Sequence, residues 1–110
     1  MIREVALLDL RSDDPETCRT FEAAFRQASP LIAATPGYID HTLDRRMEAP
    51  GRYLLLVEWE TLDAHTVGFR QSAAYQEWKA LLHHFYDPFP IVEHFEQVES
   101  PDGSANGEQP

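Results

Sequence analysis

The clearest hydrophobic pattern lies between Arg52 and Glu60, where the run Tyr53 to Val57 is apolar at odd and even positions alike. Side chains of a strand alternate between its two faces, so this pattern predicts a strand that is covered on both sides. The segment from Arg3 to Leu10 has apolar residues on both parities and predicts a second strand of this kind. Two further strands are predicted from Tyr38 to Met47 and from Ile91 to Glu99.

Helical periodicity separates these strands. Residues 12–16, with Asp as a cap and Pro15 at the first helical position, predict a helix start. The apolar residues that follow recur at i, i+3, i+4 and i+7, which predicts an amphipathic helix that Pro30 kinks or ends. Thr61 or Asp63 is expected to cap a short helix that ends near Phe69. A second helical segment is predicted over 73–85, and its inner stripe consists of Ala74, Trp78, Leu81, Leu82 and Phe85.

The order of these elements is β-α-β-β-α-β, which is the ferredoxin-like plan: an α+β fold with an antiparallel sheet and both helices on one face. The other face is apolar on two strands, and a monomer rarely exposes a patch of that size. We therefore expect a homodimer in which two sheets stack face to face about a two-fold axis. The predicted domain covers residues 1–99, and residues 100–110 are polar enough to predict a disordered tail.

Composition narrows the choice of partners. The chain has 110 residues, enough for one core, and its 9 basic against 19 acidic residues give a net charge of −10. Such a charge repels phosphate backbones, so we expect no nucleic-acid binding. No apolar run is long enough for a bilayer, and the N-terminus does not have the pattern of a signal peptide. The single cysteine, Cys18, is expected to be a packed thiol, and the cytoplasm is the simplest location.

The candidate chemistry consists of histidines, arginines and aromatic rings, because phosphate-binding glycine loops and nucleophile elbows are missing from the sequence. His65 shares a helical stripe with Phe69 and can exchange a proton near neutral pH. The alternative for His65 is a structural histidine bonded to a carbonyl. Arg70 can bind an anionic or phenolic oxygen, or it can form a salt bridge with an acid such as Glu77.

Three further rings leave alternatives open. Trp59 shares the parity of Val57, so it either covers a cavity or fills the core. His41 and His94 lie on the two predicted edge strands, far apart in one subunit but able to approach across a dimer. Their spacing matches no metal motif, so we expect no metal site.

Several blocks of the sequence, in this order, resemble the antibiotic biosynthesis monooxygenase family. They are TPGY at 35–38, RYLLLVEW at 52–59, AHTVGFRQSAAYQEW at 64–78 and the segment 90–96, so the resemblance covers nearly the whole chain except its tail. The resemblance implies a dimeric α+β barrel. It also implies an enzyme that oxidises electron-rich aromatics such as phenols, quinols or polyketide anthrones with O₂, without metal, flavin or other cofactor.

The resemblance assigns roles to the candidate residues. It implies that Trp59, Phe69 and Tyr75 form the walls of a dry pocket for an apolar aromatic ligand, with His41 as a further contact. Arg70 would stabilise the substrate anion and His65 would transfer the proton.

The chain also departs from the family. Characterised members use a cavity asparagine, whereas the only asparagine here is Asn106, and Lys79 stands where haem-degrading relatives carry a ligand histidine. Two alternatives to an enzyme remain open: a non-catalytic dimeric binding or stress-response module, and a protein whose pocket is filled by its own side chains.

Overall fold

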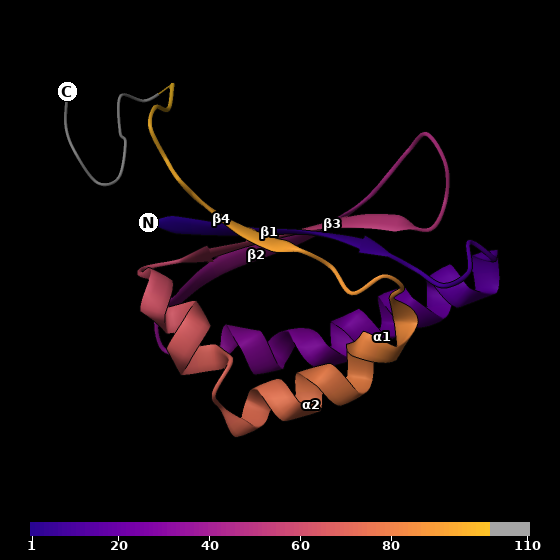
Figure 1. Ribbon diagram of the computed structural model, residues 1–110, viewed down its shortest axis with the longest axis horizontal. Helices are drawn as coiled ribbons and strands as arrows, with labels where there is room; N and C mark the ends of the chain where they lie inside the picture. The colour runs from indigo at the N-terminus through magenta and orange to yellow at the C-terminus, as the bar shows by residue number, and fades with distance from the viewer. Residues whose placement is uncertain (102–110) are drawn as a thin grey trace.

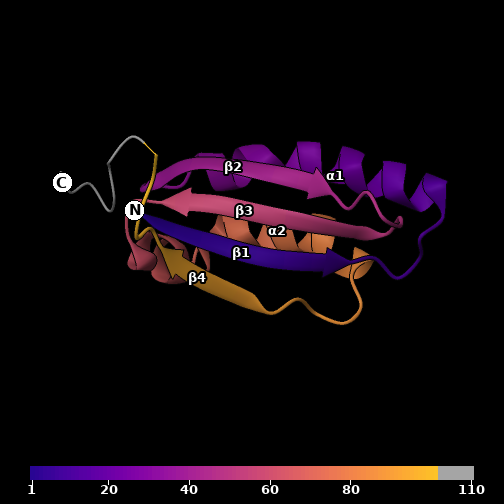
Figure 2. The ribbon, with the colours of Figure 1, turned by 90° about the horizontal axis from the view of Figure 1, so that it is seen from above.

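A computed structural model describes residues 1–101 of the chain, and the predicted tail lies almost entirely outside these described residues. Its four-stranded sheet has the order β2-β3-β1-β4, and every neighbouring pair is antiparallel. Figure 2 shows this order from above. The strands are β1 (Ile2–Asp9), β2 (Tyr38–Arg45), β3 (Arg52–Trp59) and β4 (Val92–Glu96). The predicted ferredoxin-like α+β fold is confirmed.

Both long helices lie on the same side of the sheet, as Figure 1 shows. They are α1 (Pro15–Ala33) and α2 (Ala73–Leu82); a π-helical turn, η1 (Ala64–Phe69), precedes α2, and a 3₁₀ turn, η2 (His83–Phe85), follows it. No helix within residues 1–101 is long and apolar enough to cross a membrane.

Strand β3 shows how the sheet divides its side chains between two layers. Its buried positions alternate strictly and are Tyr53, Leu55, Val57 and Trp59, which face α1 and α2. Leu54 and Leu56 point to the opposite side and are only half-buried. No element within residues 1–101 covers this opposite side (Figure 1). The helices cover one face of β3, as predicted. That the opposite face is also covered stays a prediction.

Helix α1 continues past Pro30 to Ala33, so Pro30 does not end the helix. Proline lacks the N–H that would bond the carbonyl of Arg26. The hydroxyl of Ser29 donates to that carbonyl instead, at 3.3 Å. The freed acceptor is therefore satisfied, and the last turn of the helix persists.

The other predicted elements are present with shorter bounds. Strand β2 ends at Arg45 and β4 covers only Val92–Glu96, because their predicted ends extend beyond the partner strands that could bond them. Gly51 has a φ of +98°, as a Pro-Gly turn of type II requires. Thr61 accepts a hydrogen bond from the N–H of Ala64 at 3.2 Å, which makes Thr61 the side-chain cap of η1.

Candidate functional site

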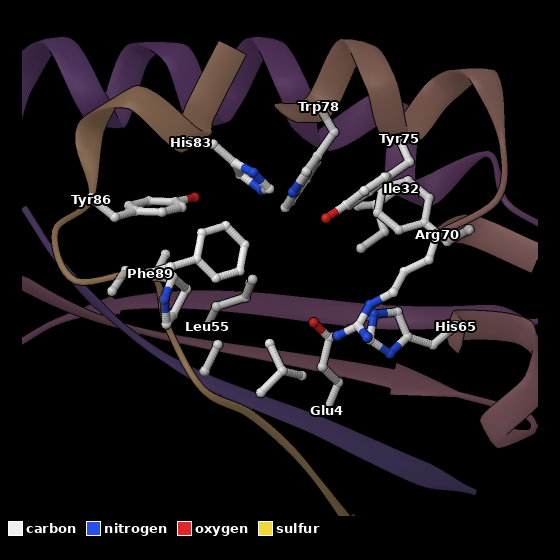
Figure 3. A pocket seen from close by; sticks show the side chains of 15 residues that line it. Glu4, Ile32, Leu55, His65, Arg70, Tyr75, Trp78, His83, Tyr86 and Phe89 are labelled. Carbon is white, nitrogen blue, oxygen red and sulfur yellow. The ribbon is translucent and has the colours of Figure 1, made fainter. Parts of the chain in front are cut away.

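A cavity of about 360 Å³ lies between the sheet and α2, within the size range of small-molecule sites. Its floor is apolar and comes from the sheet, whereas its roof comes from α2, η2 and the segment that leads to β4 (Figure 3). The residues that line it are Glu4, Ala6, Leu8, Ile32, Leu55, His65, Phe69, Arg70, Tyr75, Trp78, His83, Tyr86, Phe89, Pro90 and Val92. The cavity counts against the alternative of a pocket filled by its own side chains.

A buried carboxyl group, that of Glu4 on β1, stands at one end of this cavity. Glu4 is only 5% exposed. Its Oε1 accepts a hydrogen bond from the indole N–H of Trp59 at 3.0 Å and lies 3.3 Å from Nε2 of His65. A buried charge or acid is retained only where such partners satisfy it, so Trp59 and His65 fix the position of this carboxyl group.

The imidazole of His65 lies between Glu4 and β4 and contacts both. Its Nδ1 lies 2.8 Å from Nε2 of His94, and its ring stacks on Trp59 with centroids 5.3 Å apart and planes 19° apart. Glu4, His65 and His94 therefore form a connected row of polar contacts that begins at the cavity. No group of three or more such side chains within residues 1–101 has the arrangement of a metal site.

The π-helical turn η1 explains why His65 and Arg70 reach the same place. The N–H of Arg70 bonds the carbonyl of His65 at 3.0 Å, a five-residue spacing that is wider than that of an α-helix. Ser72 then caps α2 by accepting from the N–H of Tyr75 at 3.2 Å. This change from one turn type to the next leaves the side chain of Arg70 beside those of Glu4 and His65 (Figure 3).

The guanidinium group of Arg70 has no ion pair within residues 1–101, so the salt bridge considered with Glu77 is not formed. Burial is the main cause that lowers the pKa values of His65 and His94, and the charge of Arg70 lowers them further; the same charge opposes the rise that burial causes in the pKa of Glu4. A cation that lines a cavity without a protein partner can bind an oxygen of a ligand. Arg70 is therefore the candidate anion-binding group of this site.

Burial sets the protonation of the carboxyl–imidazole pair. It raises the pKa of Glu4, and the hydrogen bond from Trp59 and the charge of Arg70 oppose that rise. Burial first, and then the charges of Arg70 and His94, lower the pKa of His65 to about 3. His65 is therefore neutral at pH 7, and the Glu4 carboxyl has moved toward the range of a general base.

The structure brings some of the predicted site residues together and leaves others out. Phe69 and Tyr75 line the cavity with His65 and Arg70. Trp59 does not line it, because its ring is fully buried beneath His65. His41 does not line it either, because β3 separates β2 from the cavity; its Nδ1 bonds the hydroxyl of Tyr38, and its ring packs against Phe25.

The sequence contained a signal for Glu4 that the initial interpretation missed. Glu4 has the same parity as Ala6 and Leu8, which are core residues of β1, so an acid at that position must point under the helices. The pairing of His65 with His94 had no such signal. It depends on the position of η1 beside an edge strand, which the spacing along the chain does not show.

The lowered pKa of His65 predicts acid sensitivity. Between pH 6.5 and about 3 the unfolded chain binds a proton at this imidazole and the folded chain does not. The free energy of unfolding therefore decreases as the pH is lowered through this range, by up to about 1.4 kcal/mol per pH unit. The carboxyl group of Glu4 has the opposite effect above pH 4.5: because its pKa is raised, its contribution to the free energy of unfolding decreases as the pH increases. Urea denaturation across pH 3.5–7 should show a smaller pH dependence for His65→Gln than for the wild type, and an unchanged one for the exposed control His84→Gln. Equal slopes for His65→Gln and the wild type would contradict this assignment.

Comparison with known proteins places this geometry in context. A family profile for antibiotic biosynthesis monooxygenases matches residues 1–81. The uncharacterized protein YczJ of Bacillus subtilis (strain 168) is 57% identical over 98 residues, which are 89% of this chain and 100% of that protein. This chain is also similar to a protein from Bordetella bronchiseptica whose crystal structure is described as that of a putative antibiotic biosynthesis monooxygenase. The two are 41% identical with a TM-score of 0.81, and the match covers 89% of this chain and 97% of the Bordetella chain. SnoaB, a cofactor-independent oxygenase from Streptomyces nogalater, is 18% identical with a TM-score of 0.74 over 91% of this chain and 95% of its own, a likeness of fold alone.

Proposed function

The chain belongs to the antibiotic biosynthesis monooxygenase family, and on this premise we propose that it is a cofactor-independent monooxygenase of small electron-rich aromatics. The observation that carries the proposal is the position of an unpaired guanidinium group, that of Arg70, beside the buried Glu4–His65 pair at the end of a cavity with aromatic walls. Phe69 and Tyr75 supply part of these walls. A phenol, a naphthol or a quinol is a substrate of suitable chemistry.

The proposed reaction balances without an external reductant. A phenol and O₂ give a para-quinone and water: one oxygen atom becomes the new carbonyl, the other leaves as water, and the substrate supplies all four electrons. Removal of the phenolic proton makes the ring a better electron donor to O₂. The protein's part is therefore to bind the ring, accept the proton and stabilise the anion.

Arg70 and Glu4 divide this work between them. The guanidinium group of Arg70 holds the phenolate oxygen through charge-assisted hydrogen bonds. The carboxylate of Glu4, whose pKa is raised by burial, accepts the proton. His65 and His94 extend the row of polar contacts away from the cavity, and Trp59 acts as a positioning residue because its N–H fixes the carboxyl group.

Isotope labelling tests this function. The protein, treated with EDTA to remove metal ions, is incubated with 1-naphthol under ¹⁸O₂, and the product is analysed by mass spectrometry. The proposal predicts naphthoquinone with one labelled oxygen atom. Unlabelled quinone, or a yield equal to that of buffer, would contradict it.

A specific observation favours the alternative of a non-catalytic binding module. Both ring nitrogens of His65 already have partners in Glu4 and His94, as they would in a purely structural network. Such a module would bind a naphthol and gain thermal stability from it, without consuming O₂. Parallel measurements of binding and O₂ consumption separate the two functions.

We also propose that the chain forms a homodimer through the side of the sheet opposite the helices, here called the outer face. Its apolar centre consists of Val5, Leu7, Leu54, Leu56 and Phe95, all partly exposed in the single chain. Ion pairs flank this centre: Arg3 with Glu58 at one end of β1, and Asp9 with Arg52 at the other. An apolar centre with a charged rim is the usual composition of a protein interface.

A charge in the apolar centre of the outer face should separate the dimer. Leu54→Glu would bury an unpaired carboxylate between two sheets, at a cost of several kcal/mol. Sedimentation velocity at micromolar concentration is expected to give about twice the chain mass of 12.6 kDa for the wild type and a single chain mass for Leu54→Glu. The control Ala23→Glu places the same charge on the exposed surface of α1 and should remain dimeric. A wild-type protein that sediments as one chain would refute the dimer.

A further inference from the structure

The roof of the cavity carries polar atoms that the proposed reaction does not use. They belong to Tyr75, Trp78, His83 and Tyr86, here called the roof donors. Figure 3 shows their hydroxyl and nitrogen atoms in a row above the floor, directed into the cavity and across it from Glu4. Trp78 and Tyr86 are 5% and 4% exposed, so these two are almost fully buried.

The side chains of the roof donors make no hydrogen bond within residues 1–101, although their rings pack against one another and against Phe69 and Phe89. Leaving buried polar groups without partners is costly, and folded proteins satisfy nearly all of them. None of these atoms is sealed off from the cavity, since no buried side-chain polar atom of the described residues lacks a partner. The cavity, and whatever it binds, is therefore the place where the roof donors find their partners.

The chemistry of the roof donors restricts what that partner is. An indole N–H only donates, so the ligand atom opposite Trp78 must be an acceptor. Burial raises the pKa of Tyr86, which keeps its hydroxyl protonated as a donor. Arg70 is the only cation among the described residues that line the cavity, and it lies beside Glu4 and His65, across the cavity from the roof donors. The partner of the roof donors is therefore a neutral oxygen, a carbonyl or a hydroxyl, and not a carboxylate or a phosphate.

We propose that the roof donors form a second oxygen-binding subsite, so that the ligand is a flat aromatic ring system with oxygen substituents on two opposite edges. One oxygen lies at Glu4 and Arg70, and the other accepts hydrogen bonds from one or two of the roof donors, the number that its lone pairs allow. The inference rests on the proposed function in one respect only: it takes this cavity as the substrate site. It narrows the substrate class from any phenol to rings that carry two oxygens on opposite edges.

The test compares three naphthalene probes by anaerobic calorimetric titration: 2-naphthol with one oxygen, naphthalene-2,3-diol with two on one edge, and naphthalene-2,6-diol with two on opposite edges. The 2,6-diol is expected to bind about 5- to 10-fold more tightly than the other two, the effect of one additional buried hydrogen bond. The double variant Tyr75→Phe/Tyr86→Phe keeps both rings, removes only two hydroxyl groups and should reduce this preference. Tyr38→Phe, outside the cavity, is the matched control and should keep the preference.

The proposal is overturned if the wild type binds none of the probes, if it binds all three equally, or if the preference survives undiminished both in the double variant and in Trp78→Phe. Because oxygen is excluded, the result does not depend on catalysis. A preference for the 2,6-diol without any O₂ turnover would contradict the proposed function and leave the subsite standing. Turnover of 1-naphthol without a preference for the 2,6-diol would contradict the subsite alone.

Discussion

Arg70→Met is expected to lower kcat for naphthol oxidation about 100- to 1,000-fold, the usual effect of removing a group that stabilises a developing anion. Methionine keeps much of the length and apolar stem of arginine but has no charge. The fold should be preserved, because within residues 1–101 the Arg70 side chain forms no ion pair. Initial rates of quinone formation, measured by absorbance at saturating naphthol, give the effect on kcat.

A matched control separates this effect from a general loss of positive charge. Arg26 on α1 is largely exposed and lies outside the cavity, so Arg26→Met should keep the wild-type rate. The two variants have the same net charge and differ only in where the guanidinium group is lost. Equal rates for Arg70→Met and the wild type would remove Arg70 from the proposed mechanism.

Glu4→Gln is expected to lower kcat about 100- to 10,000-fold, the range for loss of a general base. An amide has the shape of a carboxyl group and can still accept the hydrogen bond from Trp59, but it cannot take a proton from the substrate. The variant should also lose the acidic limb of the kcat profile, because that limb reports protonation of Glu4, whose pKa is raised by burial. Rates between pH 5 and 9, followed for the variant and the wild type, measure both effects.

The control for this variant is Glu77→Gln on the exposed surface of α2, which should keep both the rate and the acidic limb. A purely structural role for Glu4 would lower stability and leave the pH profile unchanged. An acidic limb that persists in Glu4→Gln would therefore contradict its assignment as the base, whatever happens to the rate.

The sequence predicted the fold well because its signals are local and repeated. The inner stripe of α2 fixes which of its side chains face the core, and it agrees with the observed burial. In β3 the sequence is apolar on both parities, so it predicted the strand but not which parity the helices bury. The ends of β2 and β4 could not be predicted from local patterns, because the end of a strand depends on where its partner strand stops offering hydrogen bonds. The outcome at Pro30 depended on Ser29, whose hydroxyl replaces the lost backbone donor.

The site was predicted only in part. His65 and Arg70 could be selected as reactive groups beside a turn, and the structure places both in the cavity with Phe69 and Tyr75. The contact of His65 with His94 joins residues 29 positions apart, and no local pattern encodes it. Trp59 was expected either to cover a cavity or to fill the core; its ring is fully buried, and its N–H donates a hydrogen bond to Glu4. The cytoplasmic location stays a prediction.

Oxygen consumption in a Clark-type electrode tests the central claim most directly. EDTA-treated protein is added to air-saturated buffer with each of a panel of phenols, naphthols and quinols, and binding of the same compounds is measured by calorimetry. The proposed function predicts saturable O₂ uptake with at least one compound, at one O₂ per quinone formed, and no uptake by the Glu4→Gln/Arg70→Met double variant. Binding of the panel compounds with O₂ uptake no faster than in buffer would contradict it and identify the cavity as a binding site without catalysis.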